Sequence, residues 1–278
     1  MADIHVSVMN IDTLKNVLGF LCAKQDAEIK RIYVDISVPA DEIKTLYVPS
    51  CCELFLSSMY VFRDKDREYL NEALNSGLFK GVLIRNIETL FYLNENGPDN
   101  LKYVLDSGVY IFNSNAFSFL KENLKLSIDE IYFSNELNLK EKESLYKKIR
   151  EKDDTIKLST TVYGHLPMMI SANCISRTLE KCTKSTHFTS MKDRMGATLS
   201  VFCCCEFCYN VIYNSVPLSL HKNIRHLSGN GALRLDLTSE NNNECIDIIK
   251  FFDGINRGYE LNPPYKEYTT GHSKKGVL

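Results

Sequence analysis

The sequence predicts an α/β protein built as a TIM-type (β/α)8 barrel. Seven short runs rich in β-branched and aromatic residues alternate with segments whose apolar residues recur at helical spacing, and an eighth run comes much later. Alternating strands and helices imply parallel strands joined by right-handed crossovers, and eight such units close a barrel. An open doubly wound sheet is the alternative. No GxGxxG or GxxxxGKS/T motif follows any run, so its usual phosphate-binding loops are absent and the barrel is favoured.

Each predicted strand is a short run that ends in polar or turn-forming residues. In chain order they are HVSVMN (5–10), RIYVDISV (31–38), ELFLSSMYVF (53–62), GVLIRN (81–86), GVYIFNSN (108–115), EIYFSNEL (130–137), IKLSTTVYG (156–164) and LRLDLT (233–238). Amphipathic segments separate them. Asn138, followed three residues later by Glu141, predicts a capping-box start for the helix after the sixth strand.

The composition indicates one soluble globular domain over residues 1–278, with a cysteine-rich insertion at 165–232 between the seventh and eighth strands. The 14 Phe and 15 Tyr exclude global disorder, and the net charge of -2 gives no overall basic footprint for nucleic acid. RNA binding stays open, because a local basic patch would not change this total. No apolar run is long enough to span a membrane, and no leader pattern opens the chain, so we expect a cytoplasmic protein.

Polar side chains stand at the predicted carboxyl ends of the strands, where TIM barrels carry their active sites. They are Arg63, Arg85, Asn86, Asn113, Asn115, Glu136, His165, Asp236 and Thr238. Arginine suits bidentate binding of carboxylate or phosphate, so this rim predicts an anion site. The simpler alternative is that strand ends face water and are polar for that reason alone.

Clustered cysteines suggest a metal centre. Six of the ten cysteines lie in the insertion: Cys174, Cys182, Cys203, Cys204, Cys205 and Cys208. The first two form one pair and Cys205-x-x-Cys208 forms another, and four soft thiolates suit zinc or an iron–sulfur cluster. Cys203 and Cys204 are expected to be bystanders. The alternative is that these cysteines are small apolar residues of a buried strand.

Several blocks resemble the peptidase U32 family, also called collagenase-like proteases. The blocks are VYGHLPMMISANC, KDRMGATLSV, CEFCYNVIYNSVPLSL and RLDLTSE, ending in YTTGHSKKGVL. The resemblance runs from about Leu105 to the carboxyl terminus, and SNELNLKE places Glu136 at the family's glutamate, with Asn135 where the family usually has Arg. It is strongest to long clostridial-type members, which carry an additional amino-terminal barrel. This implies either a short standalone paralogue or a partner barrel subunit supplied by another chain.

The resemblance implies a 4Fe-4S cluster held by Cys174, Cys182, Cys205 and Cys208. It also implies oxygen-independent hydroxylation of RNA, either tRNA or rRNA, with prephenate as a possible co-substrate. Zinc is the alternative metal, in a non-catalytic scaffold subunit whose metal is bound by the same four cysteines.

In this scheme, a substrate held by Arg63 and Arg85 receives electrons from the cluster and an unidentified donor, while Glu136 or His165 handles protons. The family name states a peptidase instead. The sequence contains no GxSxG, no local cysteine-protease signature and no HExxH, and its six His never pair at helical spacing. The peptidase interpretation therefore depends on the family name alone. His272 lies on a family-like motif and has no assigned role.

Overall fold

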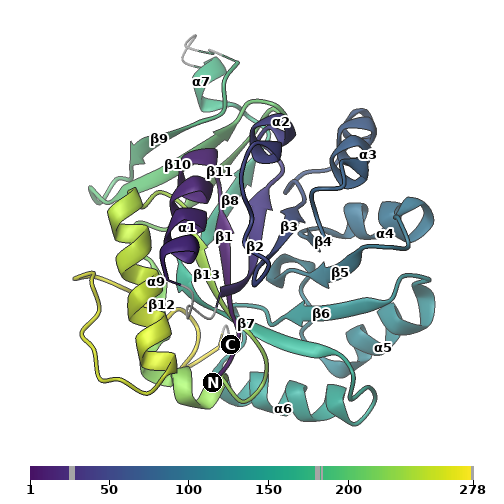
Figure 1. Ribbon diagram of the computed structural model, residues 1–278, viewed down its shortest axis with the longest axis vertical. Helices are drawn as coiled ribbons and strands as arrows, with labels where there is room; N and C mark the ends of the chain where they lie inside the picture. Colours follow the sequence, from purple (N-terminus) through teal and green to yellow (C-terminus); the bar gives the residue numbers. More distant parts are fainter. Residues whose placement is uncertain (25–28, 179–181, 183, 277–278) are drawn as a thin grey trace.

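The computed structural model describes residues 1–24, 29–178, 182 and 184–276. Its main sheet is a closed ring of eight parallel strands (Figure 1). In order around the ring these are β1 (Ile4–Val8), β2 (Ile29–Asp35), β3 (Glu53–Ser57), β4 (Gly81–Ile84), β5 (Lys102–Leu105), β6 (Ile128–Tyr132), β7 (Lys157–Gly164) and β13 (Leu233–Leu237). β7 pairs with β6 and β13, and β13 pairs with β1, so the ring closes. The predicted TIM-type barrel is confirmed.

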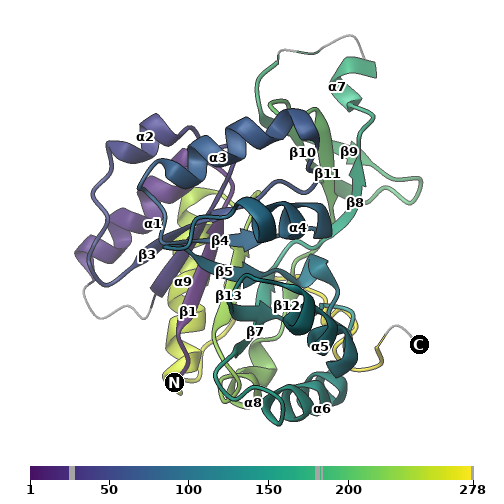
Figure 2. The same ribbon diagram turned by 90° about the vertical axis from the view of Figure 1, so that its right-hand side faces the viewer.

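Helices between the strands cover the outside of the barrel (Figures 1 and 2). They are α1 (Ile11–Ala23), α2 (Ala40–Lys44), α3 (Arg67–Asn75), α4 (Ile87–Asn96), α5 (Ser114–Asn123), α6 (Leu139–Arg150) and α9 (Asn242–Asn256). Asparagine side chains cap the starts of α1, α4, α5, α6 and α9. The predicted capping box is confirmed, since Asn138 accepts from the Glu141 amide and Glu141 accepts from the Asn138 amide. No helix in the described part of the chain is long and apolar enough to cross a membrane.

The fifth strand differs from the prediction. β5 is Lys102–Leu105, and the segment predicted as a strand at 108–115 holds part of a 3-10 turn (Ser107–Val109) and the start of α5. The alternation of exposed Tyr110, buried Ile111 and exposed Phe112 imitates a strand pattern. Tyr110, however, has a φ of 57°, which lies in the left-handed region and stops an extended run. Asn113 therefore caps a helix and does not end a strand.

The insertion between β7 and β13 forms a second, antiparallel sheet at the carboxyl-terminal end of the barrel (Figure 2). Its strands are β8 (Pro167–Ser171), β9 (His187–Lys192), β10 (Thr198–Cys204) and β11 (Tyr209–Tyr213), in the order β8-β11-β10-β9. The short α7 (Ile175–Thr178) follows β8. A two-residue strand, β12 (Leu218–Ser219), then pairs with β7, and η3 (His221–Asn223) and α8 (Ile224–Leu227) lead into β13.

Side chains alternate between the two faces of the barrel strands. In β2, Ile32 and Val34 pack in the apolar layer beneath the helices, whereas Arg31 and Tyr33 face the interior. The interior is therefore unusually polar. Arg31 Nη1 lies 2.5 Å from Glu130 Oε2, and the Glu130 side chain is completely buried.

His5 belongs to this buried interior and is held neutral. Its Nδ1 lies 2.6 Å from the hydroxyl of Tyr132. Burial, together with the positive charges of Arg31, Lys157 and Arg234, lowers the pKa of His5 well below the usual 6.5.

We therefore expect the free energy of unfolding to decrease as the pH falls below about 6.5, where the unfolded chain takes up a proton that folded His5 excludes. The contribution of His5 to this slope is at most about 1.4 kcal/mol per pH unit. Urea denaturation at neutral and mildly acidic pH measures the slope. His5→Gln should be less sensitive to acid than the wild type, and equal sensitivity of the two proteins would contradict the assignment.

Candidate functional site

A cavity of about 270 Å³ opens at the carboxyl-terminal mouth of the barrel. A narrower cleft of about 20 Å³, enough for roughly one water molecule, adjoins it. The two spaces share the residues Tyr60, Asp106, Pro167, Arg234 and Asp236. This is the end at which TIM barrels build active sites. We therefore take the two spaces together, called the mouth pocket below, as the candidate site.

Arg85 follows β4 directly and lies in the wall of the inner cleft. Its Nη1 donates to Asp35 Oδ2 at 2.6 Å and to the Ser58 carbonyl at 3.2 Å, and its guanidinium lies 4.4 Å from the centre of the Tyr60 ring. The sequence prediction thus placed Arg85 correctly at the mouth. Much of its charge is already balanced by Asp35, so it is not a free anion-binding group.

Arg234, on β13, is the cation that the sequence prediction missed. Its side chain is 3% exposed. Its Nη2 donates to Asp106 Oδ1 at 2.8 Å, and its guanidinium lies 4.2 Å from the centre of the Tyr132 ring. Burial opposes the charge of Arg234, but Asp106 and Asp236 outweigh it and raise the pKa, so the guanidinium stays protonated.

Two signals in the sequence could have located Arg234 and Asp106. In LRLDLT, the leucines alternate with Arg234 and Asp236, so the two charged residues share the inner face of a strand. Asp106 directly follows Leu105, the last residue of β5. Because the fifth strand was predicted at 108–115, Asn113 was taken as its polar end in place of Asp106.

Buried polar atoms without a hydrogen-bond partner gather around the mouth pocket. Among the described residues these include Arg234 Nη1, Ser7 Oγ, Tyr213 OH, Asn135 Oδ1 and Asp236 Oδ1. Arg234 Nε lies 2.8 Å from Asp236 Oδ1, but the contact is electrostatic only, because both atoms lack a hydrogen bond. Such groups are rare in folded proteins, and water, an ion or a ligand completes their bonding. The pocket therefore offers both free donors and free acceptors.

The two predicted catalytic residues both reach the mouth pocket. Glu136 lines its outer cavity, and its amide donates to Ser134 Oγ at 3.3 Å. His165 lines the inner cleft. Its Nδ1 lies 2.7 Å from the Asn214 carbonyl, which can only accept, so Nδ1 carries the proton. This leaves Nε2 as the basic nitrogen, 3.9 Å from Glu240 Oε1.

Arg63 and Asn113, both predicted to bind substrate, do not line the mouth pocket. Arg63 lies beyond the end of β3, and its Nη1 donates to the Phe207 carbonyl at 2.8 Å, which attaches the insertion to the barrel. Asn113 Oδ1 accepts from the amides of Asn115 and Ala116 at the start of α5. The structure gives both side chains a clear structural contact.

The four predicted metal ligands all belong to the insertion. Cys205 and Cys208 occupy the turn between β10 and β11, and Cys174 immediately precedes α7. Burial first, and then the thiols of Cys174, Cys182, Cys203 and Cys208, raise the pKa of Cys205 to about 11. The thiol of Cys205 thus interacts electrostatically with those of the other three predicted ligands. No group of three or more His, Cys, Asp or Glu in the described ranges is arranged to hold a metal ion.

The two cysteines predicted to be bystanders differ from this group in burial. Cys203 and Cys204 lie on β10 and are 1% and 0% exposed. Burial raises the pKa of Cys204 to about 12. Cys203 Sγ accepts a weak hydrogen bond from Ser176 Oγ at 3.8 Å. The thiol of Cys203 also interacts electrostatically with that of Cys205. Cys203 therefore differs from the four predicted ligands in its burial within the strand.

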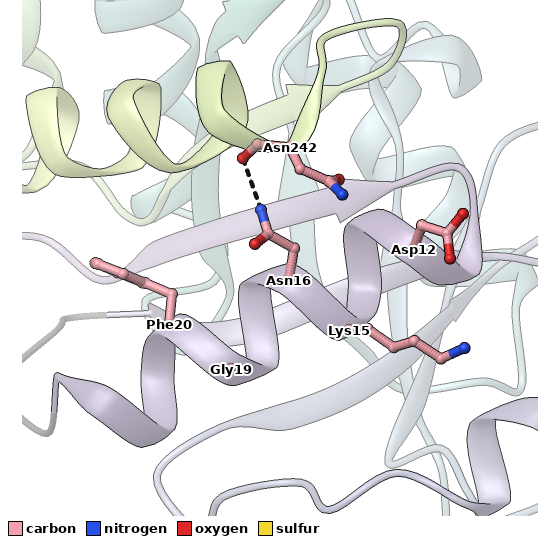
Figure 3. Close-up of a pocket in the computed structure, with 6 residues that line it drawn as sticks. All are labelled: Asp12, Lys15, Asn16, Gly19, Phe20 and Asn242. Atoms are coloured by element: carbon pink, nitrogen blue, oxygen red, sulfur yellow. Dashed lines mark hydrogen bonds between the residues drawn. The ribbon is translucent and has the colours of Figure 1, made fainter.

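A second hollow, of about 480 Å³, lies on the outside of the barrel between α1 and the start of α9 (Figure 3). Its lining consists of Asp12, Lys15, Asn16, Gly19, Phe20 and Asn242. Asn16 Nδ2 donates to the Asn242 carbonyl at 2.6 Å. Asp12 and Lys15 are exposed to solvent. None of these six residues contributes a buried polar atom without a partner, so the mouth pocket is the better candidate site.

Comparison with known proteins gives little beyond the fold. No family model and no curated protein matches the chain. Among the solved structures that match is a fructose-bisphosphate aldolase from Campylobacter jejuni, with 12% identity and a TM-score of 0.46, covering 92% of this chain and 75% of the aldolase. Assignment of function therefore depends on the residues of the site.

Proposed function

We propose that this protein is a U32-type, oxygen-independent hydroxylation factor acting on RNA, with a 4Fe-4S cluster bound by Cys174, Cys182, Cys205 and Cys208. The observation that supports the proposal is that four cysteines, two of them in the Cys205-x-x-Cys208 turn, belong to an insertion whose first residues line the mouth pocket. This puts a redox group on the segment that also borders the proposed substrate pocket.

The donor set fits the proposed cofactor. Cys182 and Cys208 are exposed and Cys174 and Cys205 are half-buried, so all four thiols are accessible to a bound group. Thiolate sulfur is the usual ligand of iron–sulfur clusters. When bound, the cluster supplies one-electron transfer.

The mouth pocket suits a small hydroxylated carboxylate such as prephenate. Arg234 Nη1 is a buried donor without a partner, suited to a carboxylate, and Asn135 Oδ1, in the outer cavity, is an acceptor without a partner, suited to a hydroxyl. The pocket contains both carboxylate and guanidinium side chains, so a ligand that carries both a hydroxyl and a carboxylate complements it. At the same pocket, His165 Nε2 and Glu136 can exchange protons with the bound molecules.

Arg234→Lys is expected to weaken prephenate binding by about 1.5–3 kcal/mol, the contribution of one hydrogen bond to a charged group. Lysine keeps the positive charge beside Asp106, but it has a single nitrogen. No second donor, equivalent to Nη1, then remains for the ligand. Isothermal titration calorimetry with prephenate measures the change. Arg63→Ala is the matched control, because Arg63 lies outside the mouth pocket, and it should bind prephenate as the wild type does. Equal losses in both variants would contradict the assignment.

The proposed function is tested by mass spectrometry of nucleosides from tRNA and rRNA of strains with and without the gene. Loss of one hydroxylated nucleoside, restored by the wild-type gene, is expected. Protein purified without oxygen should be coloured and contain iron and sulfide. Colourless protein with stoichiometric zinc and an unchanged nucleoside profile would favour the zinc-binding scaffold. Peptide cleavage abolished by one Ser or Cys substitution outside the cluster would favour the peptidase.

A further inference from the structure

Two aromatic rings stand exposed at the rim of the mouth pocket. Tyr110 and Phe112 are 56% and 38% exposed. Their ring planes lie within 6° of parallel, with centroids 5.8 Å apart. Tyr110 lines the outer cavity opposite residues of the insertion, including Met168, which is 65% exposed. A pair of exposed, parallel aromatic rings therefore borders a polar, partly buried pocket.

The backbone of Tyr110 adopts a conformation that is unfavourable for tyrosine. Tyr110 has φ 57° and ψ 51°, at the end of a 3-10 turn. Bulky residues seldom adopt this left-handed conformation, which glycine adopts without steric cost. Backbone strain of this kind is concentrated at ligand-binding sites, where the contacts of the side chain are part of the function. Tyrosine therefore occupies a position where glycine would have less backbone strain.

The insertion that lines the cavity together with Tyr110 carries a net positive charge. Residues 165–232 contain seven Lys and Arg against three Asp and Glu, a net charge of +4, whereas the whole chain has -2. Arg177, Lys184, Lys192 and Arg194 are exposed on this insertion. Its first residues, Leu166, Pro167 and Met168, line the cavity. A positively charged insertion complements a phosphate backbone, and exposed aromatic rings complement unpaired bases.

We propose that Tyr110 and Phe112 form a stacking platform for an unpaired RNA base at the mouth pocket. The inference rests on the proposed function, and it adds the site and the form of the RNA. The basic insertion contacts the phosphates, one base stacks on the free face of the Tyr110 ring, which Phe112 supports from behind, and the edge of the base faces the polar groups of the cavity. RNA in which the base is single-stranded binds, whereas a fully paired helix, whose bases are already stacked, does not reach the platform.

Fluorescence anisotropy with a labelled single-stranded RNA of mixed sequence, and with its perfect duplex, tests the platform at low salt. The wild type should bind the single strand more tightly than the duplex. Tyr110→Gly and Phe112→Leu should each weaken single-strand binding roughly 5- to 100-fold. Tyr110→Phe should keep most of the affinity. Tyr47→Ala is the matched control, since Tyr47 is 74% exposed but lies between α2 and β3 and does not line the mouth pocket.

Thermal melting separates binding from folding. Tyr110→Gly should melt at or above the wild-type temperature, because glycine relieves the left-handed strain, while its RNA affinity falls. The platform is overturned if the wild type binds no single-stranded RNA, or if both ring variants bind as tightly as the wild type. It is also overturned if these variants abolish self-association, measured by light scattering, without changing RNA binding, since the rings would then form a protein interface.

Complementation of the deletion strain distinguishes failure of the platform from failure of the proposed function. A hydroxylated nucleoside restored by the wild type but not by Tyr110→Gly supports both. Full restoration by the double variant Tyr110→Gly, Phe112→Leu overturns the platform and leaves the proposed function standing. If deletion removes no nucleoside, the proposed function fails, and the anisotropy result alone decides the platform.

Discussion

Cys205→Ser is expected to leave the protein almost free of iron after purification without oxygen. Cys205 belongs to the Cys205-x-x-Cys208 turn, and its thiol interacts electrostatically with those of the other three predicted ligands. Replacing one thiolate in a four-thiolate site opens the coordination shell, and metal affinity should fall by orders of magnitude. Elemental analysis of iron, sulfide and zinc, together with the visible absorption spectrum, measures the effect.

The matched control is Cys203→Ser, two residues away on the same strand and turn. Cys203 is buried within β10 and has a neighbour of its own in Ser176. Its replacement should leave the metal content close to that of the wild type. If Cys203→Ser loses iron while Cys205→Ser keeps it, the ligand set is shifted by two residues and our assignment is wrong.

Glu130→Gln is expected to lower the free energy of unfolding by about 3–5 kcal/mol. Glutamine keeps the shape of the side chain but removes its charge, so the guanidinium of Arg31 is left buried and unpaired. The surroundings cannot compensate, because Glu130 is 0% exposed and lies against Arg31 and Ser159. Urea denaturation followed by circular dichroism gives the change.

The double variant Arg31→Met, Glu130→Gln tests whether the loss comes from the unpaired charge. Removing the cation as well should recover much of the stability, since replacement of a whole buried pair is far less costly than breaking it. Glu143→Gln breaks an exposed ion pair with Lys147 on α6 and should barely change the denaturation midpoint. A double variant as unstable as Glu130→Gln would show that packing, and not charge, causes the loss.

The barrel was predictable because its signals are local. Alternating runs such as RIYVDISV place apolar residues toward the helices at every second position, and the helix starts are encoded by single capping side chains such as Asn138. The one misplaced strand shows the limit of this approach. The alternation around Tyr110 matches a strand in the sequence, but the left-handed backbone at that residue is a property of the folded loop.

Within the site, sequence patterns were enough to locate the residues that directly follow a strand or share a short spacing. Arg85 and His165 come immediately after β4 and β7, and Cys205-x-x-Cys208 requires only a tight turn, so their places followed from local pattern. Tertiary structure alone decided which charges meet. Arg234 and Asp106 are 128 positions apart and pair only because the closed ring brings β13 and β5 to face the same interior. The role of Arg63 was decided in the same way, since its partner, Phe207, belongs to an insertion folded back over the barrel.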